Sequence, residues 1–167
     1  MSFNEFILRS QNQTSGLAPI LRLGERLYFQ QHPPEELEKA VVSSSLQKVN
    51  PQNLVLRVTS QNSIHGLHYD VYATGLIQLA GSKRVLLLSP NQFDQANYVA
   101  RGPQARRSAL DLSEIVHQKG QSGLNVLTLT LNAGDVLLFP RLTGHQTEAY
   151  TDSFTISFWH VPDVPLQ

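Results

Sequence analysis

The chain has 167 residues, which suits one compact domain and is too short for two ordinary ones. Hydrophobic residues make up 41% of it and charged residues 16%, a balance typical of globular chains and too apolar for extended disorder. Thirteen basic residues balance thirteen acidic ones, so no overall field draws the protein to DNA or to an anionic membrane. The absence of cysteine excludes disulfides, thiolate zinc sites, iron–sulfur clusters and a cysteine nucleophile.

No membrane segment or secretory signal is predicted. The sequence lacks the roughly 18 consecutive apolar residues of a membrane helix. Residues 1–9 lack the basic-then-apolar order of a signal peptide. We therefore expect an intracellular protein, in the cytoplasm or the nucleus, with no membrane contact.

In chain order, the first element with clear signals is a helix over residues 34–46. Pro33 and Pro34 suit the first turn of a helix, and the two glutamates that follow complement the positive end of its dipole. Apolar residues four apart then share one face.

From residue 53 onward, short β-rich runs alternate with turn residues, which is the pattern of a sandwich or barrel. Residues 126–131 and 153–160 alternate strictly, so each should have one dry face, formed by the leucines in the first and by Phe154, Ile156 and Phe158 in the second. The predicted strands are 53–59, 65–71, 75–80, 84–89, 126–131, 136–139, 146–150 and 153–160.

Residues 90–123 interrupt the strands and are interpreted as a long insertion, in which only 110–117 predicts a short helix. The insertion carries the basic cluster Arg101, Arg106 and Arg107. This cluster is either a solvated loop or a loop that grips an anionic substrate.

His68 and Asp70 form a candidate metal chelate, because residues two apart on a strand point the same way. The pair alone is a weak motif. A turn and apolar strand at 134–140, followed by His145, would return a third ligand from a distant strand. Two histidines and one carboxylate on a β-scaffold form the facial triad of non-haem Fe(II) oxygenases.

Several linked motifs resemble the JmjC hydroxylases of the cupin superfamily, in particular those acting on wybutosine in tRNA or on asparagine side chains. The motifs are His-Tyr-Asp-Val at 68–71, Leu-Ile-Gln at 76–78, Gly-Ser-Lys-Arg-Val-Leu-Leu-Leu-Ser-Pro at 81–90, Leu-Asn-Ala-Gly-Asp-Val-Leu-Leu-Phe-Pro at 131–140, His145, and Ser-Phe-Trp at 157–159. The resemblance implies a mainly β fold, a double-stranded β-helix of the cupin-like jelly-roll type, with a few flanking helices. It implies a single domain over 1–167 with an abbreviated N-terminal part at about 1–52.

The resemblance also implies a site. His68, Asp70 and His145 would hold Fe(II), and 2-oxoglutarate would bind the metal through its keto acid end. The far carboxylate of this cosubstrate would pair with Lys83, because the family carries its lysine thirteen residues after the aspartate. Trp159 is expected in the core or in the cavity wall.

The chain departs from the family at several positions. Thr74 and Ser157 replace asparagines, although both can still hydrogen-bond and contribute to cosubstrate binding. A tyrosine that holds the cosubstrate in relatives would fall near Phe6 or Ile7, which have no hydroxyl group. His65 has two possible roles. It could contact the cosubstrate or support a metal ligand, or it could be a structural histidine of the strand.

The leading hypothesis is an Fe(II)- and 2-oxoglutarate-dependent oxygenase that hydroxylates a protein side chain or a modified RNA base. The departures motivate an alternative, a cupin-fold binding or scaffolding module that has lost oxygenase activity. A third possibility is a cupin enzyme that uses another metal and no keto acid, against which Lys83 argues. The substrate, whether protein or tRNA, stays open, and a monomer is expected.

Overall fold

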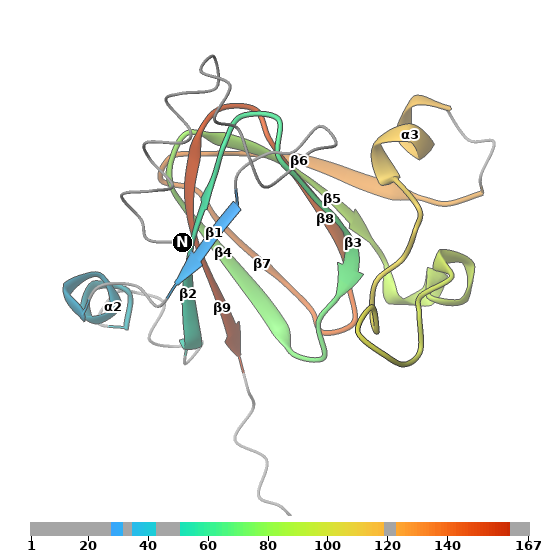
Figure 1. The fold of residues 1–167 in the computed structure, drawn as a ribbon, viewed down its shortest axis with the longest axis horizontal. Helices are drawn as coiled ribbons and strands as arrows, with labels where there is room; N and C mark the ends of the chain where they lie inside the picture. The colour runs from blue at the N-terminus through green and yellow to red at the C-terminus, as the bar shows by residue number, and fades with distance from the viewer. Residues whose placement is uncertain (1–27, 32–34, 43–50, 119–122, 161–167) are drawn as a thin grey trace, which may run out of the picture.

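The computed structural model describes residues 28–31, 35–42, 51–118 and 123–160, and these form two antiparallel sheets packed face to face (Figure 1). The first sheet has the strand order β1-β2-β9-β4-β7 and the second has the order β3-β8-β5-β6. The elements are β1 (Tyr28–Gln31), α2 (Glu35–Val42), β2 (Pro51–Thr59), β3 (Ile64–Tyr69), β4 (Ala73–Ala80), β5 (Ser82–Leu88), the 3-10 turns η2 (Pro90–Gln92) and η3 (Asp94–Ala96), α3 (Leu112–His117), β6 (Val126–Asn132), β7 (Val136–Phe139), β8 (Gly144–Ala149) and β9 (Ser153–His160).

Each predicted strand is present in the structure, with ends shifted by no more than a few residues. The predicted helix at 34–46 is observed as α2, although its expected last turn lies outside the described residues. The predicted helix at 110–117 is observed as α3, which begins after Asp111 because that side chain accepts a hydrogen bond from the backbone N–H of Ser113. Strand β1 and the two 3-10 turns were not predicted.

The chain alternates between the two sheets from β2 to β5 and again from β6 to β9. This winding is the double-stranded β-helix, so the predicted fold class is confirmed. It brings strands β3 and β8 side by side, although they lie far apart in the sequence. None of the helices in the described part of the chain is long and apolar enough to cross a membrane.

The space between the sheets has an apolar end and a polar end. The apolar end is one cluster of buried side chains: Leu76, Val85, Leu87, Leu131 and Phe139. At the polar end, the interior is lined by histidines, hydroxyl groups and three charged side chains. Because burying polar groups is costly unless they find partners, the polar end is where a ligand is expected.

The expectation of one dry face on each alternating strand is only partly correct. In β9, Ile156 and Phe158 are buried as expected, but Ser153, Thr155 and Ser157 on the other face are also buried. The serine and threonine face lines the polar end of the interior rather than solvent. In β6, Leu131 is buried while Leu127 is 56% exposed, since β6 is the edge strand of its sheet.

The insertion packs on the outer face of the second sheet. Ala96 and Leu112 from the insertion are fully buried against Leu67, Leu86 and Leu88. These apolar side chains complete a second core, so this part of the insertion packs on the sheet, whereas Arg101, Arg106 and Arg107 are exposed.

Gln146 of β8 joins the insertion to the sheet. It is almost fully buried and accepts a hydrogen bond from the backbone N–H of Leu112 at 2.9 Å. Its amide nitrogen donates to the carboxylate of Asp111 at 2.7 Å. One buried amide therefore fixes the start of α3 on strand β8.

Candidate metal centre

The structure brings together the three predicted ligands. His68 lies on β3, Asp70 follows that strand directly, and His145 lies on β8 opposite His68 in the antiparallel register. One ligand atom from each residue lies within 4.8 Å of the other two. Nε2 of His145 is 3.8 Å from Oδ2 of Asp70. These spacings allow the three side chains to hold one metal ion.

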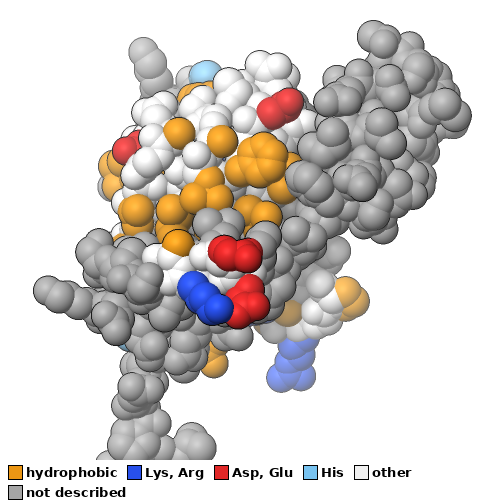
Figure 2. Space-filling view, turned by 90° about the vertical axis from the view of Figure 1, so that its left-hand side faces the viewer, with side chains coloured by type: hydrophobic (Ala, Val, Ile, Leu, Met, Phe, Trp, Pro, Cys, Tyr) orange, Lys and Arg blue, Asp and Glu red, His pale blue; other side chains and the backbone are white. Residues whose placement is uncertain are grey.

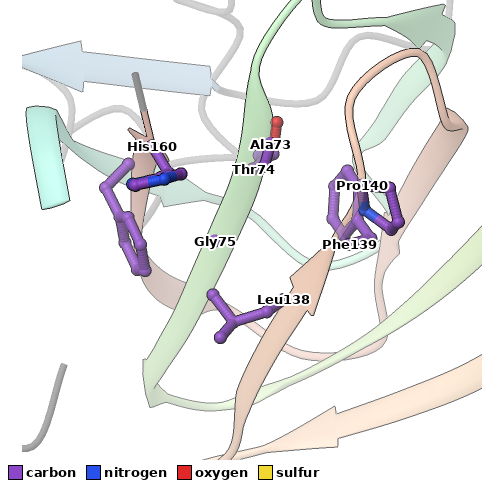
Figure 3. A pocket seen from close by; sticks show the side chains of 8 residues that line it. Ala73, Thr74, Gly75, Leu138, Phe139, Pro140 and His160 are labelled. Carbon is purple, nitrogen blue, oxygen red and sulfur yellow. The ribbon is translucent and has the colours of Figure 1, made fainter. Parts of the chain in front are cut away.

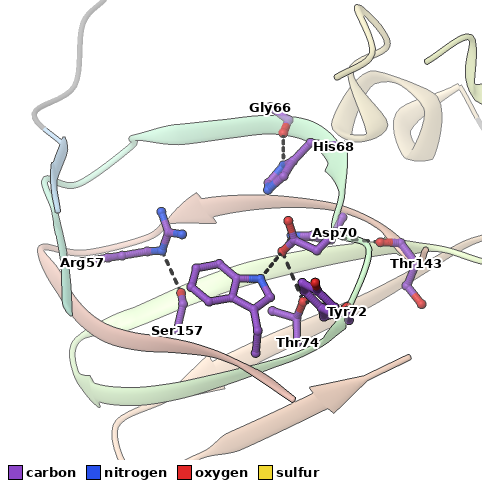
Figure 4. A network of polar contacts seen from close by, with 10 residues as sticks. Arg57, Gly66, His68, Asp70, Tyr72, Thr74, Thr143 and Ser157 are labelled. Carbon is purple, nitrogen blue, oxygen red and sulfur yellow. Dashed lines mark hydrogen bonds and ion pairs between the residues drawn. The ribbon is translucent and has the colours of Figure 1, made fainter. Parts of the chain in front are cut away.

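Both imidazoles present the same nitrogen to this site. Nδ1 of His68 lies 2.9 Å from the carbonyl of Gly66, as Figure 4 shows, and Nδ1 of His145 lies 3.1 Å from the carbonyl of Thr143. A carbonyl oxygen only accepts hydrogen bonds, so each Nδ1 carries the proton. Each Nε2 therefore has a free lone pair, which is the form that binds a metal.

Burial keeps the two histidines neutral. Burial and, to a lesser extent, the neighbouring His145 lower the pKa of His68 to about 3, although the Gly66 carbonyl and Asp70 oppose the shift. Burial also lowers the pKa of His145, against the opposing effects of the Thr143 carbonyl and Asp70. Near neutral pH no proton competes with a metal ion for either Nε2.

Asp70 is held as a carboxylate by two side chains from the first sheet. Burial raises the pKa of Asp70, but the hydrogen bond from Trp159, the two imidazoles and the hydrogen bond from Thr74 outweigh it, so the pKa lies below its ordinary value. Oδ2 accepts from Nε1 of Trp159 at 2.8 Å and from Oγ1 of Thr74 at 3.2 Å (Figure 4). These contacts also fix the direction of the carboxylate.

His65 stacks on His68, with ring centroids 4.3 Å apart and an interplanar angle of 26°. Residues three apart on a regular strand point to opposite faces. Here the pairing of β3 with β8 is irregular between His65 and His68, and this bulge turns both rings toward the cavity. Burial, together with the neighbouring His68 and further cationic groups, lowers the pKa of His65 to about 2, so this ring is also neutral.

Two neighbouring cavities lie at and beside the cluster. A small one of about 30 Å³ lies at the three ligands, and a larger one of about 210 Å³ lies beside it. His65, Lys83 and Thr147 line both cavities. The narrow space at the ligands and the wider one therefore share a wall formed by these three residues.

Lys83 is the buried cation of this wall. It is only 4% exposed, and burial lowers its pKa to about 8, with Arg57 adding to the shift. Within the described part of the chain, its ammonium group has no carboxylate partner at ion-pair distance. A buried cation without a compensating charge favours an anionic ligand.

The two substitutes for asparagine have protein partners. Thr74 donates to Asp70, as described above, so it supports a metal ligand. Ser157 accepts a hydrogen bond of 2.7 Å from Nε of Arg57 (Figure 4). Phe6 and Ile7, where the tyrosine of relatives was expected, lie outside the described residues.

Sequence reasoning missed Arg57 and the direct contact of Trp159 with Asp70. Arg57 lines the ligand cavity from β2. The available signal was a charged residue between Leu56 and Val58, in a strand that is otherwise apolar there. Trp159 was expected in the core or cavity wall, and it does line the ligand cavity.

The predicted arginine cluster is divided in the structure. Backbone hydrogen bonds from Tyr69 to Arg106 and from Ser108 to Leu67 hold this part of the insertion along the edge of β3. Arg107 thereby comes to line the larger cavity, next to His65 and Lys83. Arg101 and Arg106 are exposed, and neither lines this cavity.

A third cavity lies on the opposite face of the first sheet. Figure 3 shows this shallow, apolar pocket of about 290 Å³, lined among others by Gly75, Leu138 and His160. Hydrophobic side chains also gather on the side of the molecule that carries α2, as Figure 2 shows. Phe158 lines this pocket, whereas its neighbours on β9, Ser157 and Trp159, line the cavity at the metal ligands, so the first sheet lies between the two cavities; Thr74 lines both.

Two wound antiparallel sheets with a His–Asp–His cluster between them define a cupin-type domain. The family profile described as the cupin-like domain matches residues 1–164, so the chain belongs to the cupin-like domain family, and the predicted resemblance to the cupin superfamily is confirmed.

Two proteins with similar sequences are named for the synthesis of wybutosine in tRNA. The chain is 33% identical over 98 residues to tRNA wybutosine-synthesizing protein 4 of Gibberella zeae, covering 59% of this chain and 9% of that protein. It is 31% identical over 110 residues to tRNA wybutosine-synthesizing protein 5 of Homo sapiens, covering 65% and 34%. The chain thus spans only about a third of the length of the second relative and about a tenth of the first.

Among solved structures, the Drosophila melanogaster CENP-C cupin domain aligns with a TM-score of 0.40 and 12% sequence identity, over 64% of this chain and 59% of that one.

Proposed function

We propose that this domain is an Fe(II)- and 2-oxoglutarate-dependent oxygenase. The observation that carries the proposal is the combination of a His–Asp–His cluster, with neutral imidazoles and an ionised carboxylate, and a buried lysine on the wall of the same cavity. The cluster offers two imidazole nitrogens and one carboxylate oxygen, the donor set that suits non-haem Fe(II). The lysine offers a positive charge to a second group on the same ligand.

The three donor groups already have the protonation states that binding of Fe(II) requires. His68 and His145 are neutral, and Asp70 is ionised, so one unit of negative charge offsets part of the charge of Fe(II). When bound, iron and 2-oxoglutarate would supply, with molecular oxygen as the oxidant, the chemistry in which one oxygen atom enters a C–H bond of the substrate and the other enters succinate, with release of carbon dioxide.

The residues of this chain would bind, orient and shield the reactants. Gly66 and Thr143 fix the imidazoles through their carbonyls, and Trp159 and Thr74 fix the carboxylate. Lys83 would hold the far carboxylate of 2-oxoglutarate in a low-dielectric setting, where an ion pair is strong, and would select a dicarboxylate over a monocarboxylate.

A modified RNA base is the substrate class that the relatives favour, because both are named for tRNA wybutosine synthesis. Arg107 on the wall of the larger cavity could contact a phosphate group. A protein side chain is the other substrate class. Mass spectrometry of tRNA and of proteins from cells with and without the gene, searching for a gain of one oxygen atom, separates the two.

A second candidate function rests on a specific observation. Thr74 and Ser157, which stand where relatives use amides, are both engaged with other side chains. A cupin module that binds a metal or a partner, but oxidises nothing, would not need these two side chains to contact a cosubstrate. Calorimetric titration of 2-oxoglutarate into the protein with Mn(II) separates the two functions, because binding heat favours the oxygenase and its absence favours the binding module.

The test of the proposed activity is succinate formation from 2-oxoglutarate with Fe(II). We expect turnover in the unmodified protein and none in His68→Ala or Asp70→Ala. His117→Ala, which removes an exposed imidazole of α3, is the matched control and should leave turnover unchanged. Succinate formation that survives loss of both ligands would refute the assignment.

A further inference from the structure

Arg57 enters the ligand cavity from the first sheet. Its neighbours Leu56 and Val58 are buried on the other face of β2, and Arg57 points between the sheets. It pairs with Thr155 across β2 and β9. The side chain lies beside Ser157 at one end of the polar network drawn in Figure 4.

The hydrogen bond from Nε of Arg57 to Oγ of Ser157, at 2.7 Å, fixes the plane of the guanidinium group. Burial lowers the pKa of Arg57 and the nearby Asp70 raises it, but a guanidinium group does not lose its proton in proteins. A permanent positive charge thus stands within electrostatic range of the carboxylate that serves as a metal ligand.

Among the residues described, cationic side chains outnumber carboxylates in the lining of the cavity. The lining contains two cations, Arg57 and Lys83, and one carboxylate, Asp70. A divalent metal ion increases this excess. A ligand with two carboxylates offsets most of this positive charge, and each cation can then face one carboxylate.

The two cations occupy different parts of the site. Lys83 lines the ligand cavity and also the larger cavity beside it, whereas Arg57 lines only the cavity at the metal ligands. A cosubstrate that reaches from the metal ligands toward the larger cavity therefore meets Arg57 near its metal-bound end and Lys83 near its far end.

We propose that Arg57 binds the carboxylate of the keto acid end of the cosubstrate, while Lys83 binds the far carboxylate. This inference rests on the proposed function. The planar guanidinium group matches a carboxylate in a bidentate arrangement, which a lysine cannot reproduce.

The test measures binding of two keto acids, with Mn(II) in place of Fe(II) and without turnover. 2-Oxoglutarate has both carboxylates, whereas pyruvate has only the keto acid end. Because charge-assisted hydrogen bonds contribute about 1.5–3 kcal/mol, Arg57→Leu should weaken both ligands by about 10- to 150-fold. Lys83→Met should weaken 2-oxoglutarate by a similar factor and leave the affinity for pyruvate within about twofold.

The matched control is Arg84→Leu. Arg84 follows Lys83 on β5, points to the outer face and approaches Glu148 at 3.5 Å, so its loss removes an arginine without touching the cavity. Both keto acids should bind this variant as tightly as the unmodified protein. Mn(II) affinity, followed by electron paramagnetic resonance, should stay within about threefold in Arg57→Leu and thereby reports that the ligand cluster is folded.

Arg57→Lys covers the case in which Arg57→Leu does not fold. It keeps the charge and loses the bidentate contact, so pyruvate should bind it about tenfold more weakly. Unchanged pyruvate affinity in either variant overturns the inference, and so does a loss confined to 2-oxoglutarate, which would place Arg57 at the far carboxylate. If the unmodified protein binds neither keto acid, both the proposed function and this inference fail. If it binds them and the Arg57 variants bind them equally well, only this inference fails.

Discussion

Replacing Lys83 by methionine should make the metal-free protein more stable at neutral pH. Lys83 is 4% exposed, and burial, with a contribution from Arg57, lowers its pKa from 10.5 to about 8. Each pH unit between the folded and unfolded pKa values corresponds to about 1.4 kcal/mol, so burial of the ammonium group costs about 3 kcal/mol. Methionine fills a similar volume and carries no charge, so Lys83→Met should recover most of this free energy.

The pH dependence identifies the lysine as the cause. Between pH 8 and about 10.5 the unfolded chain holds a proton that the folded chain has lost, so the stability of the unmodified protein should rise with pH. Above about pH 10, Tyr98 acts in the opposite direction, because burial raises its pKa to about 12 and the folded state then retains the proton. Urea unfolding at pH 7, 8, 9 and 10 with a chelator present therefore covers the useful range.

The slope between pH 8 and 10 should disappear in Lys83→Met. Lys39→Met, which removes a lysine that is 73% exposed on α2, should keep both the slope and the stability of the unmodified protein. With Mn(II) and 2-oxoglutarate at saturating concentration, the unmodified protein should gain stability and Lys83→Met should gain much less. A metal-free Lys83→Met protein that is less stable than the unmodified one at pH 7, or that keeps the same slope, would show that the lysine is structural and refute this reasoning.

Three further changes test the support of the site and the core. Thr74→Val removes the hydroxyl donor to Asp70 at nearly constant volume and should weaken Mn(II) binding about tenfold, as measured by electron paramagnetic resonance. Gly75→Ala places a methyl group against the buried ring of Phe158 and should cost about 1–3 kcal/mol in urea unfolding, whereas an unchanged midpoint would show that the ring moves freely. Gln146→Leu should cost about 1–3 kcal/mol and speed hydrogen exchange in α3 before it affects metal binding; equal exchange rates would contradict the role assigned to the amide.

The strands could be predicted from alternation, but alternation does not tell which face of a strand meets solvent. In β9, Ile156 and Phe158 alternate with serine and threonine residues that are also buried, and Phe154 at the start of the strand is partly buried. The sequence reports a chemical difference between the two faces. Only the winding of the chain places the hydroxyl face against a polar cavity rather than against water.

The site could be predicted where neighbouring residues carry it and not where the fold assembles it. His68 and Asp70 follow from a spacing of two on one strand. Arg57 had no such signal, because a single arginine on a strand is ordinarily exposed. Its place in the cavity depends on the pairing of β2 with β9, which brings it to Ser157 one hundred residues later.

The groups that orient the two imidazoles could not be predicted from the sequence, because they belong to the backbone. Each imidazole donates to the carbonyl two residues before it, Gly66 in one case and Thr143 in the other. Residues two apart on a strand share a face, so the backbone itself supplies the acceptor, and any residue type could provide that carbonyl. His68 and His145 are directly opposite in the register of β3 and β8, so the same hydrogen bond from imidazole to carbonyl is found on both of these paired strands.

Asp70 differs from the two histidines because it lies just beyond the end of β3, where no ladder continues. Its orientation depends on the side chains of Trp159 and Thr74 instead. The carboxylate should therefore be the ligand most sensitive to substitution of its neighbours, while substitutions at the positions of Gly66 and Thr143 that preserve the backbone should leave the imidazoles in place.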